Sequence, residues 1–546
     1  MINCFVVLLW ALSVLPILLI VLNIFQLEEY SLKKLYFWHI KNFNRVIKFY
    51  SILLFARLLI LPLLFAINFY IKFVCIILFL VFSFTYSYIV YLKHFSLTKT
   101  PLKFTKRINR FILIFFILVV VGLNLIEMLV FANFIKYMFL FQVLWFVFFF
   151  FEAHLFSVVI EKIIFTFYKN QAIKKLRKME DLIVVGITGS YGKTTVKNIL
   201  HTILSEDFFV CKTPKSYNTP NGIVKSIREN LQKDHQIFIC EMGANKNHDI
   251  KKLTKLMGDK LKIGIITSVG KQHLDGFKTI DNIYHTKFEL AEAVRKNNGV
   301  MIFNISNFYV RKMFNEFDGN KIAVMLDGYN DGDDFDLPNM LKIENLVSGE
   351  ILRATKDGSL FKMAFNGDNL GEFTSKLLGE HNVLNSIIAS SAAMILGEDA
   401  EDIKIGLNKV KQVPNRLELK ILKLGAILID NGFNSNPISA EKALGALKYF
   451  DNYKKVVVTP GLIELSSEQF TENYILGGKI AKVADKAVIL NEVNKKALTN
   501  GLLDAGFNKE NIIYYKNFND ELVKFLNELD KSYVVLIEND LPSNYI

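Results

Sequence analysis

A glycine-rich stretch with one lysine and two threonines carries the residue types best suited to binding phosphate. It reads Thr188-Gly189-Ser190-Tyr191-Gly192-Lys193-Thr194-Thr195 and lies between a β-branched run and a helical pattern. Glycines let the backbone curl so that its N–H groups face phosphate oxygens, and the following helix adds its positive end. Lys193 would reach the outer phosphates and Thr194 would hold Mg²⁺. We therefore predict a nucleotide-binding loop, although Ile187 occupies a position where the general pattern has glycine.

Two further side chains follow expected strands. Glu241 comes directly after the apolar run 237–240, and His273 follows the run 263–267. A carboxylate at the C-terminal end of a parallel strand lies in the crevice where ligands bind, and hard cations prefer oxygen ligands. Glu241 is therefore a candidate Mg²⁺ ligand. For His273 the residues alone leave a structural role and a ligand role equally open.

Two polar segments could bind a ligand, or could only form a turn and a helix cap. Residues 213–222 form a loop rich in hydroxyl and amide groups, which suits a polar substrate or simply a turn. Asn382 and Asn385 are three residues apart and share one face of an expected helix. They could present amides to a base or ribose, or cap the helix.

The elements that position these side chains alternate between strands and helices. From residue 181 the pattern is that of a three-layer α/β domain, and residues 320–375 indicate a small β-rich addition. The composition shifts near 413–416, after which a second α/β pattern of about 130 residues follows, a usual domain size. We predict one domain over 181–413 and another over 414–546.

The first 165 residues are far more apolar than the rest. Five runs there approach the roughly 20 residues that cross a bilayer, namely Phe5–Leu27, Phe49–Tyr70, Phe73–Leu92, Phe111–Ala132 and Phe134–Ile160. The first has no basic residue before it and no clear cleavage site, so we interpret it as a retained helix. Basic residues gather in alternate loops, which places the chain after residue 165 in the cytoplasm. We predict a membrane region of about five helices over 1–165 and a basic linker over 166–180.

Composition narrows the class of protein further. The chain of 546 residues has a net charge of +13 and 52% hydrophobic residues. The basic loops of a membrane protein explain this charge. Because the sequence has no zinc knuckle or helix-turn-helix signature, we predict no nucleic-acid partner. Four cysteines without C-x-x-C spacing indicate neither a disulfide framework nor a cysteine metal site. Arg57 and Glu127 fall within apolar runs, and we favour an ion pair or an interfacial position over a transport path.

In this order, the motifs of residues 181–546 resemble the Mur ligase family of ATP-dependent amide ligases, which build the peptide of peptidoglycan. Residues 188–195 resemble the family's T-G-[ST]-x-G-K-T-[ST] loop. The segments E-M-G-A at 241–244, Q-H-L-D-G-F at 272–277 and N-S-N-P-I-S at 434–439 resemble the branch that adds D-alanyl-D-alanine (MurF). The implied fold class is a multi-pass α-helical membrane region followed by α/β, with a P-loop central domain and a Rossmann-like C-terminal domain.

The resemblance also implies roles for individual residues. The catalytic set would be Lys193, Lys287, His273 and Arg416. Two Mg²⁺ ions would be held by Thr194, Glu241, His273 and a carbamylated Lys287. ATP would meet Thr188, Gly189, Ser190, Tyr191, Gly192, Lys193, Thr194, Thr195, Asn382, Asn385, Arg416, Asp430 and Asn431. The acceptor would meet Ser216, Asn218, Thr219, Asn434 and Asn436.

The implied reaction joins D-Ala-D-Ala to UDP-MurNAc-tripeptide through an acyl phosphate, at the inner membrane and beside other cell-wall synthesis proteins. Three features depart from the family pattern. Asn431 replaces the second residue of an Asp-Asp pair, Glu538-Asn539-Asp540 stands where the family often has K-G-S, and membrane segments replace the uridine-binding domain. Two alternatives therefore stay open: a ligase of this family with a different or lipid-linked acceptor, and a non-catalytic nucleotide-binding membrane scaffold.

Overall fold

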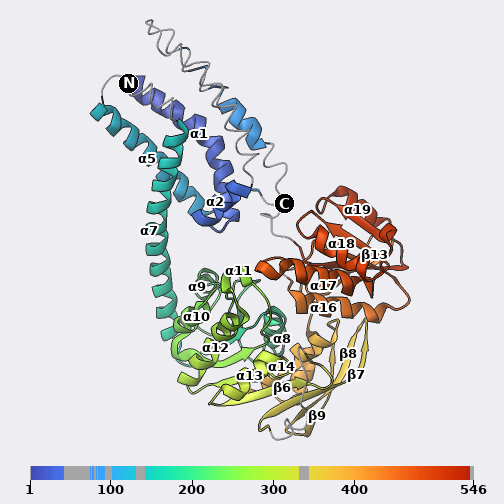
Figure 1. Cartoon of the computed structure of the whole chain (residues 1–546). Helices are drawn as coiled ribbons and strands as arrows, with labels where there is room; N and C mark the ends of the chain where they lie inside the picture. Colours follow the sequence, from blue (N-terminus) through green and yellow to red (C-terminus); the bar gives the residue numbers. More distant parts are fainter. Residues whose placement is uncertain are drawn as a thin grey trace. The chain divides into compact units, whose positions relative to one another are not determined.

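The computed structural model describes residues 2–41, 101–130, 142–330, 343–433 and 435–540, with parts of 74–92. It consists of two compact units, Met1–Thr166 and Phe167–Leu541 (Figure 1). The first unit is helical in its described residues, and the second contains two β-sheets. Each unit is described by itself below.

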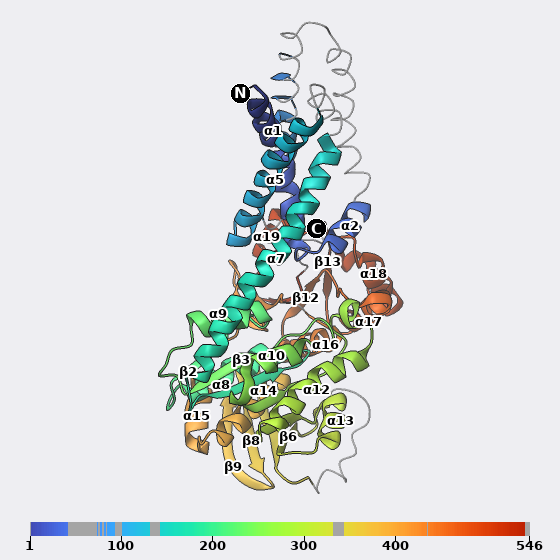
Figure 2. The same cartoon turned by 90° about the vertical axis from the view of Figure 1, so that its left-hand side faces the viewer.

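Aromatic contacts hold the described helices of the first unit together. These helices are α1 (Ile2–Leu27), α2 (Leu32–Lys41), α5 (Lys106–Val130) and the first part of α7 (Gln142–Arg177). Phe25, Phe111 and Phe150 come from α1, α5 and α7, and their ring centroids lie 5.1–6.0 Å apart. Figure 2 shows these three helices running side by side. Arg110 of α5 also donates to Glu161 of α7 at 2.5 Å.

Membrane character is only partly visible in the described residues. One helix, Leu144–Arg177, is long and apolar enough to cross a bilayer, and the pair Val14–Leu27 and Leu32–Ile40, bent by 110°, would make a second span if counted as one. Soluble proteins also contain one or two such helices, so this alone does not establish a membrane region. The run Phe49–Tyr70 and Arg57 lie outside the described residues, as does the side chain of Glu127. The five-helix arrangement stays a prediction.

Most of the basic linker expected over 166–180 is helical, because helix α7 runs from Gln142 to Arg177. Its role as a boundary between domains stays a prediction. Lys174, Lys175 and Arg177 lie in its last turn, where cations interact favourably with the helix dipole.

The first sheet of the second unit has nine strands in the order β2-β3-β1-β4-β5-β6-β7-β8-β9. The pairs from β2 to β7 are parallel, whereas β7-β8-β9 are antiparallel. The strands are β1 (Ile183–Thr188), β2 (Val210–Lys212), β3 (Ile237–Glu241), β4 (Leu261–Ile266), β5 (Val300–Asn304), β6 (Lys321–Leu326), β7 (Leu346–Thr355), β8 (Gly358–Phe365) and β9 (Asp368–Ser375). The β-rich segment expected at 320–375 is therefore present, but it extends this sheet instead of standing apart.

Helices cover both faces of this sheet, which is why its central strands are apolar throughout. The helices are α8 (Lys193–Leu204), α9 (Pro220–Glu229), α10 (Asp249–Met257), α11 (Leu274–Phe277), α12 (Ile280–Lys296), α13 (Phe308–Glu316), α14 (Glu380–Ile395) and α15 (Ala400–Lys409). On β1, Val185 and Ile187 join the core under α8. The intervening Gly186 faces α12, because a Cβ there would lie 3.0 Å from a Leu290 methyl group.

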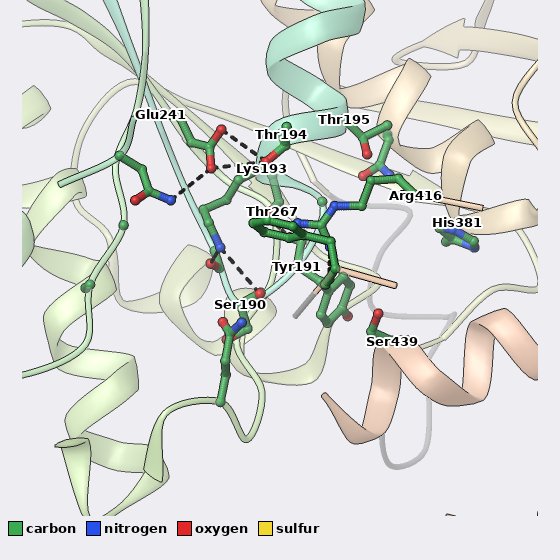
Figure 3. Close-up of a pocket in the computed structure, with 18 of the residues that line it drawn as sticks. Ser190, Tyr191, Lys193, Thr194, Thr195, Glu241, Thr267, His381, Arg416 and Ser439 are labelled. Carbon is green, nitrogen blue, oxygen red and sulfur yellow. Dashed lines mark hydrogen bonds between the residues drawn. The ribbon is translucent and has the colours of Figure 1, made fainter. Parts of the chain in front are cut away.

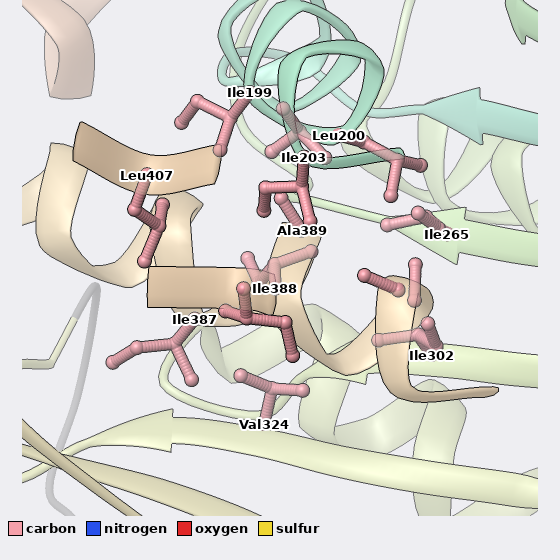
Figure 4. Close-up of a cluster of buried hydrophobic side chains, with 14 of the residues drawn as sticks. Ile199, Leu200, Ile203, Ile265, Ile302, Val324, Ile387, Ile388, Ala389 and Leu407 are labelled. Atoms are coloured by element: carbon pink, nitrogen blue, oxygen red, sulfur yellow. The ribbon is translucent and has the colours of Figure 1, made fainter. Parts of the chain in front are cut away.

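The core of this domain lies between α8, α14 and the strands. Its members are buried and mostly aliphatic, and they include Ile199, Ile203, Ile387, Ile388, Ile265, Ile302 and Val324 (Figure 4). This packing fixes the start of α8 against the sheet. The glycine-rich loop that precedes α8 is therefore held by a rigid frame.

The second sheet belongs to the C-terminal domain and has six strands in the order β10-β11-β15-β12-β13-β14. Only β10 is antiparallel to its neighbour. The strands are β10 (Glu418–Ile421), β11 (Ile427–Asn431), β12 (Lys454–Thr459), β13 (Lys486–Leu490), β14 (Ile512–Tyr515) and β15 (Tyr533–Glu538). The main helices are α16 (Pro437–Ala446), α17 (Gln469–Ala481), α18 (Lys495–Asp504) and α19 (Asp520–Asn527). The alternating α/β pattern expected after residue 413 is confirmed.

Candidate active site

The loop between β1 and α8 can only be built with glycines at two positions. Gly192 has φ 84°, a left-handed conformation, and a Cβ there would lie 2.8 Å from Asn385 Oδ1. A Cβ at Gly189 would lie 2.0 Å from Thr267 Oγ1. The loop therefore approaches the neighbouring strand end and α14 more closely than any larger residue permits.

Lys193 begins α8 and lines a pocket at this loop (Figure 3). Its Nζ donates to the carbonyl oxygens of Gly189 and Ser190. Burial, opposed by Glu241 and assisted by the nearby Arg416, lowers the pKa of Lys193 to about 8. The pocket thus combines two cationic side chains with a loop whose backbone N–H groups can donate hydrogen bonds to phosphate oxygens.

Glu241 ends β3 and is 1% exposed. The Thr194 hydroxyl donates to its carboxylate at 3.1 Å, Asn218 Nδ2 donates to Oε1 at 3.1 Å, and Lys197 Nζ donates to Oε2 at 2.9 Å. Burial would raise the pKa of Glu241, but Lys197 and Lys193 outweigh it and the pKa is lowered. Glu241 is thus an ionised, buried carboxylate beside a threonine hydroxyl, a donor set that suits Mg²⁺.

Lys287 lies in α12 and is 3% exposed. Within the described residues it has no hydrogen-bond or ion-pair partner. Burial, and then the charge of Lys193, lower the pKa of Lys287 well below its ordinary value. A lysine without a partner at this depth is unusual, because buried lysines are normally paired.

His273 precedes α11 and lines the same pocket. Its Nδ1 pairs with the carboxylate of Glu464, which belongs to the C-terminal domain. Two residues earlier, Lys271 contacts Glu468 at 2.5 Å and Glu472 at 2.7 Å. The loop after β4 is therefore tied to the C-terminal domain by three acidic side chains.

The C-terminal domain adds a further cation to the pocket. Arg416 Nη1 donates to the carbonyl oxygen of Phe433 at 2.8 Å, and its guanidinium lies 4.6 Å from the centre of that residue's ring. Burial lowers the pKa of Arg416, while Glu241 and Glu538 raise it. Lys193 and Arg416 therefore face one pocket from different domains.

The structure brings most of the predicted site residues together. Those that line the pocket are Gly189, Ser190, Tyr191, Gly192, Lys193, Thr194, Thr195, Asn218, Thr219, Glu241, His273, Asn382, Asn385, Arg416 and Asn431. Asn385 Nδ2 donates to Asn382 Oδ1 at 3.1 Å, so these two amides lie together as their spacing predicts.

Other predicted residues lie outside the pocket lining, including Ser216 and Lys287. Thr188 is fully buried and donates to the carbonyl of Met242 at 3.0 Å. Asp430 instead pairs with Lys420 at 2.6 Å. Asn436 caps α16, because its Oδ1 accepts from the Ser439 amide at 2.9 Å. Asn434 lies outside the described residues.

Three residues of the site did not emerge from the sequence. Lys442 of α16 lies with its ammonium 4.0 Å from the ring centre of Tyr191. Burial and the charge of Lys442 lower the pKa of His381 to about 3, so this ring is neutral. The position of Lys197 near the site could have been predicted, because it lies one helical turn after Lys193 on the same face of the helix.

Residues 187–393 match the Mur ligase middle domain. Over this segment the chain is similar to the Mur ligase family. It is 28% identical over 306 residues to the UDP-N-acetylmuramoyl-tripeptide–D-alanyl-D-alanine ligase of Buchnera aphidicola (subspecies Baizongia pistaciae), covering 56% of this chain and 62% of that protein. The corresponding ligase of Haemophilus influenzae is 27% identical over 381 residues, covering 69% and 74%. The chain thus spans less than two thirds of the first of these relatives.

Solved structures share the fold of the second unit. MurF from Acinetobacter baumannii superposes with a TM-score of 0.57 at 23% identity, covering 69% of this chain and 78% of that one. MurF from Thermotoga maritima, solved in complex with ADP, has a TM-score of 0.57 at 23% identity, covering 69% and 80%. These similarities confirm the α/β architecture of two domains.

Proposed function

We propose that the chain ligates D-alanyl-D-alanine to UDP-MurNAc-tripeptide with consumption of ATP. The observation that carries the proposal is the single pocket where Lys193 and Glu241 of the middle domain meet Arg416 of the C-terminal domain. The names of the curated relatives support this choice of substrates. The alternative of a non-catalytic scaffold is disfavoured, because Lys193, Thr194 and Glu241 are all retained and mutually placed.

The chemistry divides into two balanced steps. A carboxylate oxygen of the tripeptide attacks the γ-phosphorus of ATP, the bond to the bridging oxygen breaks, and ADP leaves. The amine of the dipeptide then attacks the acyl carbon, phosphate leaves, and the nitrogen loses a proton. Lys193 and Arg416 neutralise charge on the phosphoryl oxygens during the first step. Removing one such preorganised group costs about 10²–10³-fold in turnover.

The residues at Glu241 fit a magnesium ion. Its carboxylate and the Thr194 hydroxyl are hard oxygen donors at adjacent positions. When bound, Mg²⁺ would shield the charge of the phosphates and orient them. His273 would serve a second ion once it leaves Glu464, a change that fits closure of the two domains around ATP.

Lys287 fits carbamylation. An amine reacts with carbon dioxide only when unprotonated, and burial lowers the pKa of Lys287 well below its ordinary value, which favours the unprotonated form. The carbamate would turn an unpaired amine into an anionic oxygen donor, and the charge of the nearby Lys193 would favour that anion.

We further propose that the helical unit before residue 167 holds the enzyme at the inner face of the cytoplasmic membrane, beside other cell-wall synthesis proteins. The apolar helix Leu144–Arg177 supports this location. The match to the family begins only at residue 187. A lipid-linked peptide acceptor is therefore the second candidate substrate.

The deciding assay uses the full-length chain in detergent with ATP, Mg²⁺, D-Ala-D-Ala and UDP-MurNAc-tripeptide. We expect phosphate release together with a product whose mass is that of the pentapeptide precursor. Lys193→Met should lower this turnover about 10²–10³-fold, whereas Lys296→Met, on the exposed part of α12, should leave it unchanged. If the protein gives no product from UDP-MurNAc-tripeptide but turns over a lipid-linked peptide, the lipid-linked peptide is the acceptor.

A further inference from the structure

Lys197 is one of the largest fully buried side chains of the protein, with 1% exposure. It lies on α8, four residues after Lys193, and is not among the pocket-lining residues. A lysine is almost never buried to this extent without a partner. Its ammonium therefore has a structural task beside the pocket that direct contact with a ligand does not explain.

The partners of Lys197 come from two different segments. Its Nζ donates to Glu241 Oε2 at 2.9 Å and to the carbonyl oxygen of Lys215. Lys215 lies in the loop 213–219, which carries Asn218 and Thr219, and adopts φ 47°, a conformation that is uncommon outside glycine. One ammonium group thus joins the candidate metal ligand to the loop expected to face the acceptor.

The same loop is attached at two further points to Glu241 and at one point to Gly243. The Glu241 amide donates to Thr213 Oγ1 at 3.1 Å, and Asn218 Nδ2 donates to Oε1 at 3.1 Å. The Gly243 amide donates to the Asn218 carbonyl at 2.8 Å. Lys197 closes this network, because among the described residues it alone bonds both the Glu241 carboxylate and the middle of the loop.

The distribution of donors around Glu241 gives its two oxygens different tasks. Oε2 is held by Lys197, and Oε1 by the neutral amide of Asn218, while the Thr194 hydroxyl reaches both. A cation can displace a neutral amide donor more easily than a charged ammonium group. Oε1 is therefore the oxygen available to a metal.

We propose that Lys197 is a positioning residue that fixes Glu241 for binding a divalent cation through Oε1 and fastens the acceptor-facing loop 213–219 to that carboxylate. The inference rests on the proposed function, in which Glu241 is a metal ligand. It adds that the metal site and the acceptor loop form one unit, so that disturbing Lys197 changes both together.

The test measures ADP binding to the full-length chain by calorimetry, with and without Mg²⁺. The readout is the gain in affinity that Mg²⁺ produces. Loss of a residue that orients a metal ligand costs about 10–100-fold in metal affinity, so Lys197→Met and Lys197→Arg should each lose about 10-fold or more of this gain. ADP affinity without Mg²⁺ should change by less than about two-fold, because Lys197 does not line the pocket.

The matched control is Lys212→Met. Lys212 also bonds to α8, through Asn198 Oδ1 at 2.9 Å, but it does not contact Glu241. It should keep the full Mg²⁺ gain. Hydrogen exchange of residues 213–219 should rise in both Lys197 variants and stay at the wild-type level in Lys212→Met.

The outcomes separate the inference from the proposed function. If Lys197 were only a counter-ion that Mg²⁺ displaces, Lys197→Met would strengthen the Mg²⁺ gain, and this would overturn the proposal. Lys197→Arg keeps the charge and changes the geometry. If this variant kept both the wild-type increase in ADP affinity with Mg²⁺ and the wild-type hydrogen exchange of residues 213–219, the proposal would also be overturned. Glu241→Gln reports on the proposed function itself, because a full Mg²⁺ gain in that variant would remove Glu241 from the metal site.

Discussion

Replacing Lys287 by methionine should stabilise the protein while removing its activity. The amine of Lys287 is 3% exposed and lies near another cation, Lys193. Methionine has a similar length, is apolar and costs nothing to bury. If the carbamate of Lys287 holds a metal, its loss should reduce turnover by about 10²–10³-fold. Stability and activity should therefore change in opposite directions.

The pH dependence of this stability difference follows from the lowered pKa of Lys287. The unfolded chain binds the Lys287 proton up to its ordinary pKa of 10.5, whereas the folded chain releases it at a much lower pH. Wild-type stability therefore rises with pH between these two values, by about 1.4 kcal/mol per pH unit. The methionine variant lacks this contribution, so its advantage is largest at low pH and shrinks as the pH approaches 10.5.

Thermal unfolding in bicarbonate-free buffer measures this difference, because without carbon dioxide the amine stays free. For a domain of 150–250 residues, each kcal/mol shifts Tm by about 2–4 °C. Within the pH window in which only the unfolded chain binds this proton, the Tm advantage of Lys287→Met should fall by about 3–6 °C per pH unit, and scans at pH 7 and pH 9 compare two points along it. Lys296→Met, exposed on the same helix, should change Tm equally little at both values. A variant less stable than wild type by the same amount at both pH values would refute the reasoning, since Lys287 would then have a stabilising partner.

Three further changes test the frame around the site. Gly192→Ala should weaken ADP binding about 10-fold or more in calorimetry, because a Cβ in that left-handed position would meet Asn385 Oδ1 at 2.8 Å. Ile388→Ala should lower the free energy of unfolding in urea by about 2–5 kcal/mol, because Ile388 is fully buried between α14 and the sheet. Glu398→Gln should raise Tm above pH 7, and the gain should vanish as the pH falls toward 4.5, because burial and then Asp207 raise the pKa of Glu398 to about 7.

The strands and the phosphate loop could be predicted from sequence because their signals are local. Apolar β-branched runs bounded by turn residues mark β1, β3 and β4, and the glycines at 189 and 192 have no other use than a tight turn. Glu241 could be placed because a parallel strand ends directly before it. These features depend on neighbours within a few residues along the chain.

The remaining features depend on contacts between distant segments, which a single sequence does not encode locally. The contact of Tyr191 with Lys442 joins residues of different domains. The alternation of residues 320–375 indicates strands but not the sheet edge that they extend. The burial of Lys197 follows from the loop 213–219 folding over α8, and its spacing from Lys193 could show only that the two share a helical face.

The two departures from the family pattern in the C-terminal domain lie side by side on neighbouring strands. Asn431 ends β11 and Glu538 ends β15, and the parallel register places them side by side. Asn431 Nδ2 donates to Glu538 Oε2 at 2.7 Å. An aspartate and a lysine at these positions would instead pair as opposite charges, with the donor on the other strand. In this chain the hydrogen bond between β11 and β15 runs from Asn431 to Glu538, whereas in an aspartate–lysine pair the donor would lie on β15.

Charge explains how the reversed pair is tolerated. An aspartate–lysine pair has no net charge, whereas an asparagine–glutamate pair carries one negative charge in a place where Glu538 has no exposure. Burial raises the pKa of Glu538 to about 7, against the opposing effects of Ser435, Asn431 and Arg416. The carboxyl is therefore partly protonated near neutral pH, and its remaining charge is offset by Arg416. This couples the altered pair to Arg416, which lines the same pocket as Lys193, so the C-terminal departure bears on the charge of that pocket.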